Sequence, residues 1–217
     1  RPKVDGDDNS NNMTFEIINI CAHGPVAFRI FNFLSEAEME HIKMVGSFIG
    51  MKRSTVSEEA LETIDRTSQT VWIERSKSFV VDNVIRRISD VTGVPQEVLF
   101  LNASSESLQL VHYFGGELYK AHVDYGTDRP HNRFITFLMY LHHVEEGGNT
   151  SFPKADEKCR DENDYFGVQP VKGSVMFFYN LFQDGNVDPK TQHYAEPPVE
   201  CEKWMTNLWI WDKVFTR

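Results

Sequence analysis

At 217 residues the chain suits one domain, and its formal net charge of −10 argues against nucleic acid as the main partner, because phosphate contacts need a basic face. No run of about eighteen apolar residues occurs, so the sequence predicts no membrane span. The polar start predicts a flexible arm over residues 1–19, and residues 20–217 are expected to form a single domain.

A strand over residues 26–33 and two helices are predicted in the first half of the chain. Ser35 is a natural N-cap and Glu38 completes a capping box, so a helix is expected to begin there. A second helix is predicted from Asp82, with apolar residues at helical spacing, and it stops at Gly93.

From Ser107 onward the pattern changes to short segments rich in β-branched and aromatic residues. These segments cover residues 107–114, 117–126, 133–144, 174–182 and 203–214. The stretch "FITFLMYL" from Phe134 to Leu141 is apolar at nearly every position, as expected of a strand buried on both faces. The sequence therefore predicts the α+β class, with helices followed by an all-β sandwich or barrel.

The stretch "YKAHVDYG" carries His122 and Asp124, which stand two residues apart. On a strand such residues point to the same face, so an imidazole and a carboxylate can aim at one point. His193 comes from a much later β segment. Two histidines and one carboxylate form the facial triad typical of non-haem Fe(II) oxygenases, which leaves coordination positions open.

Lys203 follows His193 and begins the last predicted strand. A lysine aimed inward from a β core costs free energy unless it meets an anion. The distal carboxylate of 2-oxoglutarate is such an anion. The sequence thus predicts a cosubstrate site beside the metal site.

The order H-x-D, then H, then K resembles the prolyl 4-hydroxylase family of Fe(II)/2-oxoglutarate dioxygenases, of the collagen, plant and algal type. The likeness extends over roughly residues 20 to 213 and is carried by the strings "LQLVHYFGGELYKAHVDYG", "RFITFLMYLHHVEEGGNTSFP", "VKGSVMFFYNL" and "HYAEPPVECEKWMTNLWIW". The resemblance implies a double-stranded β-helix (jelly-roll) core with supporting N-terminal helices. It also implies hydroxylation of peptidyl proline at C4 with O2 and 2-oxoglutarate, releasing succinate and CO2, while ascorbate rescues oxidised iron.

The resemblance also implies roles for individual residues. Those that would hold Fe(II) are His122, Asp124 and His193. Those that would bind 2-oxoglutarate are Lys203, Tyr113 and Thr150. Those that would line a groove for a proline-containing peptide are Tyr119, Arg133 and Trp209.

Two of the groove residues carry further expectations. Tyr119 lies an odd number of positions before His122, so on a regular strand it faces the opposite way, unless a bulge or twist turns it. Arg133 is expected to grip a peptide carbonyl without touching the iron or the cosubstrate.

The sequence departs from the family pattern at two places. Tyr194 and Glu196 are larger than the residues the family often has after the distal histidine, and residues 200–202 ("ECE") replace a usual glycine near the lysine. Both changes are predicted to reshape the mouth of the pocket, which affects the choice of substrate more than metal binding.

The cysteines Cys21, Cys159 and Cys201 show no CxxC spacing, which argues against a zinc ribbon or a thioredoxin-type motif. One disulfide can form in an oxidising compartment, and Cys201 is interpreted as a buried small hydrophobe. Asn-x-Ser/Thr triplets, which also arise by chance, occur at Asn12, Asn102 and Asn149. We expect the endoplasmic reticulum lumen or secretory pathway, with the cytoplasm as the alternative and any partner subunit left open.

Three rival functions remain. Another 2-oxoglutarate oxygenase with a non-prolyl substrate is one, although lysyl hydroxylases hold the cosubstrate with arginine where this chain has Lys203. A non-catalytic jelly-roll binding module is the second. A cupin-type zinc hydrolase is the third, and it would need no 2-oxoglutarate.

Overall fold

The computed structural model describes residues 16–55, 64–100, 104–126 and 131–212. Most of the predicted arm lies outside the described residues, as do the triplets at Asn12 and Asn102. The first strand, however, already begins at Ile17, because it pairs with the next strand at the edge of the main sheet. The folded domain therefore starts slightly before the predicted boundary at residue 20.

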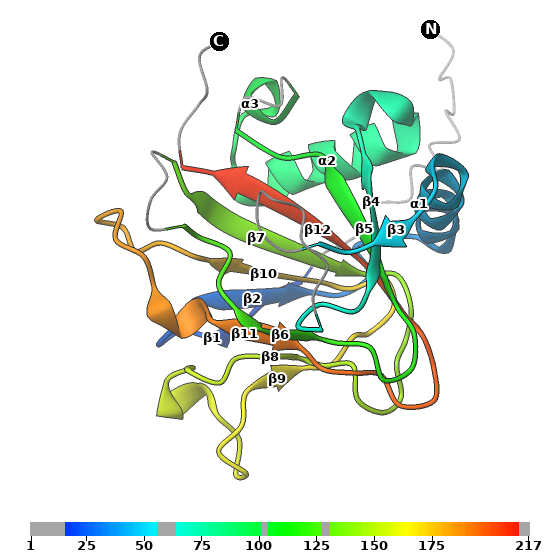
Figure 1. The fold of residues 1–217 in the computed structure, drawn as a ribbon. Coiled ribbons are helices and arrows are strands. Elements are labelled where there is room, and N and C mark those ends of the chain that lie inside the picture. The colour runs from blue at the N-terminus through cyan, green and yellow to red at the C-terminus, as the bar shows by residue number, and fades with distance from the viewer. Residues whose placement is uncertain (1–15, 56–63, 101–103, 127–130, 213–217) are drawn as a thin grey trace, which may run out of the picture.

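Two antiparallel sheets lie one below the other (Figure 1). Within the described residues the larger sheet has the order β1-β2-β10-β7-β12-β5-β4-β3 and the smaller one the order β6-β11-β8-β9. The strands of the larger sheet are β1 (Ile17–Cys21), β2 (Ala27–Ile30), β3 (Lys52–Arg53), β4 (Gln69–Ile73), β5 (Leu108–Tyr113), β7 (Arg133–Tyr140), β10 (Val175–Tyr179) and β12 (Lys203–Trp211). The strands of the smaller sheet are β6 (Tyr119–His122), β8 (Thr150–Ser151), β9 (Gly167–Val168) and β11 (His193–Ala195).

The helices pack on the face of the larger sheet that points away from the smaller one, above it in Figure 1. They are α1 (Glu36–Ile49), α2 (Phe79–Thr92) and α3 (Gln96–Phe100), and the 3-10 turns are η1 (Arg75–Lys77), η2 (Glu157–Cys159) and η3 (Pro189–Thr191). The predicted capping box is present: Ser35 N donates to Glu38 Oε2 at 2.8 Å, and Glu38 N donates to Ser35 Oγ at 3.3 Å. The second helix begins at Phe79, earlier than predicted, because the Ser78 hydroxyl already caps it.

Strand β7 explains how the sheet separates two cores. Its residues Ile135, Phe137 and Met139 face the helices, whereas Leu138 and Tyr140 face the smaller sheet. This alternation confirms the prediction of a strand that is buried on both faces. Thr136, Leu138 and Tyr140 therefore point into the space between the sheets.

A disulfide joins Cys21 at the end of β1 to Cys159 in η2. Cys201 is free, and it is half-buried rather than buried as predicted. The reason is its place in the turn between β11 and β12, where the preceding Glu200 has a φ of 50° and the chain runs along the surface. Among the described residues, no helix is long and apolar enough to cross a bilayer.

Candidate metal centre and adjoining pocket

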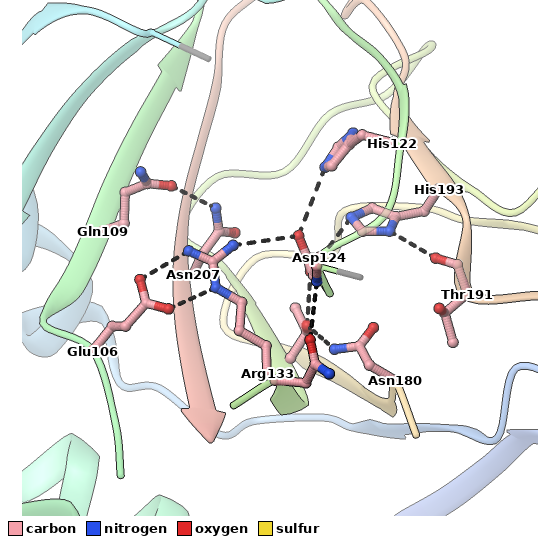
Figure 2. A network of polar contacts seen from close by, with 12 residues as sticks. Glu106, Gln109, His122, Asp124, Arg133, Asn180, Thr191, His193 and Asn207 are labelled. Carbon is pink, nitrogen blue, oxygen red and sulfur yellow. Dashed lines mark hydrogen bonds and ion pairs between the residues drawn. The ribbon is translucent and has the colours of Figure 1, made fainter. Parts of the chain in front are cut away.

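Three side chains converge between the two sheets (Figure 2). His122 ends β6 and His193 begins β11, and the two residues are direct cross-strand partners. The Nε2 atoms of His122 and His193 lie 3.9 Å and 3.8 Å from the carboxylate oxygens of Asp124. One potential ligand atom from each residue lies within 4.8 Å of the others, which is a suitable arrangement for one metal ion.

Asp124 does not lie on the strand from which its position was predicted. Strand β6 ends at His122, and Asp124 lies in a bend beyond it, so the expected alternation along one strand is not what aligns the pair. The carboxylate is fixed instead by Thr136, whose hydroxyl donates to Asp124 Oδ2 at 2.7 Å. Asn180 Nδ2 in turn donates to Thr136 Oγ1 at 2.8 Å.

Both histidines are oriented by backbone carbonyls. Nδ1–H of His122 donates to the carbonyl of Lys120 at 2.8 Å, and Nδ1–H of His193 donates to that of Thr191 at 2.9 Å. This fixes the tautomer in which each Nε2 keeps its lone pair and faces Asp124. Both imidazoles are thus presented as metal ligands.

The charges of the site also suit a metal ion. Burial lowers the pKa of His122 to about 3, with a further contribution from His193, so that imidazole is neutral at physiological pH. Burial alone would raise the pKa of Asp124, but His193, His122 and Arg133 outweigh it and hold that pKa well below its usual range. Neutral imidazoles and an ionised carboxylate are the protonation states in which these groups bind metals, and two histidines with one carboxylate fit Fe(II).

A cavity of about 450 Å³ opens beside the three ligands. Every residue predicted to act in the site lines it except Lys203, which lies behind the wall. The predicted residues on the wall are His122, Asp124, His193, Tyr113, Thr150, Tyr119, Arg133 and Trp209. Further residues on the wall that the sequence did not single out include Arg66, Trp72, Gln109 and Asn207.

Lys203 is completely buried at the start of β12, opposite Tyr113 on β5. Its Nζ donates to the carbonyl of Gly148 at 2.6 Å, and it forms no ion pair with the residues that the structure describes. Burial lowers the pKa of Lys203 to about 7. A buried ammonium with no carboxylate partner is costly, so this position favours an anionic ligand.

The neighbours of Lys203 include Tyr113, which was predicted to bind the cosubstrate, and Tyr140, which was not predicted. The ammonium lies 5.6 Å from the ring centroid of Tyr113 and 5.7 Å from that of Tyr140. The hydroxyls of Tyr140 and Thr150 share a hydrogen bond of 3.0 Å. Tyr140 was hidden in the apolar run of β7, although its even position on that strand places it on the same face as Leu138.

Tyr119 faces the metal site because β6 contains a bulge. Cross-strand partners are His193 with His122 and Ala195 with Tyr119, so β6 has one residue more than β11 between these pairs. The extra residue turns Tyr119 to the same side as His122, and the two rings stack with centroids 3.6 Å apart. The bulge therefore interrupts the regular alternation of this strand and places Tyr119 beside His122.

Arg133 is more deeply engaged than predicted. Its guanidinium donates to both carboxylate oxygens of Glu106, at 2.6 and 2.9 Å, and stacks 3.8 Å above the ring of Trp209. Arg133 Nη1 also lies 3.9 Å from Asp124 Oδ1 (Figure 2). This approach to one of the three candidate ligands was not predicted, and the expectation that Arg133 touches neither iron nor cosubstrate stays a prediction. Glu106, which holds Arg133, had no recognisable sequence signal.

Replacing Thr136 by valine is expected to weaken Fe(II) binding by about ten- to a hundredfold, because it removes the hydroxyl that orients Asp124 while keeping the side-chain shape. Anaerobic titration with Fe(II) measures the change. Thr92→Val at the end of α2 is the matched control and should bind iron as the unmodified protein does. Equal affinities in the two variants would contradict the role given to Thr136.

Known proteins resemble this chain in sequence. A family model described as the 2OG-Fe(II) oxygenase superfamily matches residues 108–211. Probable prolyl 4-hydroxylases 7 and 8 of Arabidopsis thaliana are 32% and 31% identical over 210 and 224 residues, covering 89% and 95% of this chain. The chain spans 65% of the length of the first relative and 74% of the second.

Solved structures show the same fold. A viral collagen prolyl hydroxylase from Paramecium Bursaria Chlorella virus-1, solved as a 2OG complex, matches with a TM-score of 0.64 at 24% identity, over 87% of this chain and 97% of that one. A prolyl hydroxylase from Trichoplax adhaerens, in complex with a peptide fragment of the hypoxia inducible factor oxygen degradation domain, matches with a TM-score of 0.61 at 17% identity, over 87% and 84%. These likenesses confirm the predicted double-stranded β-helix.

Proposed function

The chain belongs to the prolyl 4-hydroxylase family of the 2OG-Fe(II) oxygenases, and from this membership we propose that it hydroxylates proline residues in peptides, with 2-oxoglutarate and O2 as cosubstrates. One observation carries the proposal beyond family membership. Beside one cavity lie a triad of two histidines and one carboxylate and a fully buried lysine that forms no ion pair with any described residue. A metal hydrolase would have no use for that lysine, whereas a dicarboxylic cosubstrate would neutralise it.

In this proposal His122, Asp124 and His193 hold Fe(II), and the metal with its cosubstrates supplies the oxidising chemistry that converts C–H into C–OH and releases succinate and CO2. Lys203 binds the distal carboxylate of 2-oxoglutarate. The hydroxyls of Thr150 and Tyr113 complete that anion site. These residues line or adjoin one cavity, so the protein contributes position and electrostatics to the reaction.

The peptide is proposed to lie along the outer part of the cavity. Tyr119 and Trp209 line the cavity, and Arg133 keeps one guanidinium nitrogen that is not used by Glu106. A polyproline II segment suits such a groove, because its ordering entropy is low and its carbonyls are free to accept. The net charge of −10 favours neutral or basic peptides, an effect that fades with salt.

Incubation of the iron-loaded protein with a panel of proline-containing peptides tests the function. Mass spectrometry should detect a gain of one oxygen on proline, and the active peptides should stimulate 2-oxoglutarate turnover. If small metabolites or free amino acids stimulate turnover and proline peptides never do, the prolyl hydroxylase proposal is wrong and only the broader oxygenase class survives.

Arg133→Ala is expected to reduce both peptide binding and peptide-independent 2-oxoglutarate turnover, because Arg133 both lines the groove and lies against Asp124. A loss of about tenfold or more in each is expected, as for other residues that orient a metal ligand. Arg86→Ala on the surface of α2 serves as the control. Peptide-independent turnover that stays at the unmodified level would show that Arg133 serves the peptide alone.

We further propose ascorbate as the reductant of the enzyme and the endoplasmic reticulum lumen or secretory pathway as its compartment. The disulfide between Cys21 and Cys159 supports an oxidising compartment, since such bonds are rare in the cytosol. Alkylation of the protein isolated from its native cell tests this, because only Cys201 should react before reduction.

A further inference from the structure

Glu196, one of the residues that departs from the family pattern, lies at the centre of a cluster of hydroxyl groups on the smaller sheet. Its Oε1 accepts from Ser151 Oγ at 2.5 Å, from Tyr194 Oη at 3.0 Å and from the hydroxyl of Tyr165. Asn149 Nδ2 donates to Tyr165 Oη at 3.2 Å and thereby joins the cluster. An ionised carboxylate only accepts hydrogen bonds, so three converging hydroxyls suit a negative charge here.

The cluster lies directly behind the proposed cosubstrate pocket. On β8 and β11, Ser151 pairs with Tyr194 and Thr150 pairs with Ala195. Because side chains alternate along a strand, the first pair faces the cluster while the second pair lines the cavity. Glu196 therefore ties together the outer side of the two strands whose inner side forms the pocket wall.

Backbone contacts connect Glu196 to Lys203. The amide of Glu196 donates to the carbonyl of Asn149 at 2.9 Å, and the amide of Gly148 donates to the carbonyl of Pro197 at 3.0 Å. The carbonyl of Gly148 is the acceptor for Lys203 Nζ. The segment that begins with Glu196 thus holds the loop on which the ammonium group rests.

Glu196 also provides a negative charge near Lys203. This charge acts from a distance, since Lys203 forms no ion pair with the described residues. The groups that face Lys203 are the rings of Tyr113 on β5 and Tyr140 on β7 and the carbonyl of Gly148. Burial lowers the pKa of Lys203, and Glu196 opposes this shift. Two further charged groups lie nearby. Arg29 on β2 acts on Tyr140, and Glu202, just before β12, pairs with His112 on β5.

We propose that Glu196 is a positioning residue for the cosubstrate: its negative charge keeps Lys203 cationic in the empty pocket, and its hydroxyl cluster holds β8 and β11 in register behind Thr150. This inference rests on the proposed function, since it assigns Lys203 to 2-oxoglutarate. In this proposal Tyr194 and Glu196, the large residues after His193, act on the outer side of the pocket wall and not at the mouth of the pocket.

Anaerobic calorimetry of the Fe(II)-loaded protein with 2-oxoglutarate, from pH 6 to 8.5, tests the proposal by binding alone. In the unmodified protein the affinity should fall as the pH rises past about 7, where Lys203 loses its proton. Glu196→Gln should move that fall to lower pH by about one unit, which corresponds to binding about tenfold weaker at pH 8 but only about twofold weaker at pH 6. Glu196→Asp should retain most of the unmodified behaviour.

Two further variants separate charge from structure. Tyr165→Phe removes one donor of the cluster but no charge, so it should change the affinity equally at every pH. Lys203→Arg places a permanent cation in the pocket, so the fall above pH 7 should disappear even if Glu196→Gln fails to fold. Identical pH profiles for Glu196→Gln and the unmodified protein, or a fall that persists in Lys203→Arg, would overturn the inference.

Failure of the inference and failure of the proposed function give different results. If 2-oxoglutarate binds with the expected pH shifts but no proline peptide is hydroxylated, the role of Glu196 stands and the choice of substrate is wrong. If the unmodified protein binds no 2-oxoglutarate at any pH, both are wrong.

Discussion

Replacing His193 by alanine is expected to reduce iron-dependent 2-oxoglutarate turnover by more than about a hundredfold. Loss of a residue that merely orients a metal ligand costs about ten- to a hundredfold, and removal of a ligand itself should cost more. The fold should survive, because His193 lies at the start of a short strand while both apolar cores are built by other side chains. Turnover at modest Fe(II) concentration measures the loss of activity, and a thermal melt measures whether the fold is kept.

His143→Ala is the matched control, since His143 is exposed just beyond β7 and takes no part in the site. It should leave turnover unchanged. Turnover at the unmodified rate in His193→Ala would remove His193 from the metal site and leave a pair of ligands that is insufficient for the proposed chemistry.

Lys203→Ala is expected to raise the 2-oxoglutarate concentration needed for half-maximal turnover by at least about a hundredfold. Removing one partner of a buried ion pair costs roughly 3–5 kcal/mol, and each 1.4 kcal/mol corresponds to about a tenfold change in affinity. Arginine should rescue binding only in part, because its planar fork is longer and differently shaped. Initial rates at varied 2-oxoglutarate measure the effect.

Lys172→Ala offers a control of the same residue type, since Lys172 pairs with Glu36 on the surface, at 2.5 Å.

The affinity for 2-oxoglutarate should also depend on pH. Burial holds the pKa of Lys203 at about 7, so the pocket is cationic below that pH and loses its charge above it. An unchanged cosubstrate requirement in Lys203→Ala would exclude the lysine from this role.

Local patterns predicted those parts of the fold that depend on near neighbours. The capping box at Ser35 and Glu38 was found from four letters of sequence and is formed as expected. The apolar run of β7 was correctly interpreted as a strand buried on both faces. The start of the second helix was misplaced, because the apolar residues before Asp82 hid the cap at Ser78.

Within the site, the order of the chemical groups could be predicted, but the geometry that unites them could not. Asp124 lies beyond its strand, and Tyr119 faces the site through a bulge, because the irregularities depend on how β6 pairs with β11. Residues such as Tyr140, Glu106 and Glu196 act through contacts with segments distant in the sequence. A single sequence has no signal for such contacts, although one hydroxyl residue in an apolar strand, Thr136, was a visible clue.

Because His122 and His193 are cross-strand partners, a metal bound to both would also have a structural role. Strand β6 is at the edge of the smaller sheet, and β11 is its neighbour in that sheet. An ion bound by both imidazoles would add a cross-link between the edge strand and β11. Loss of the ion is expected to loosen this edge and to expose it to proteases, so that the lifetime of the protein in the cell would depend on its metal content.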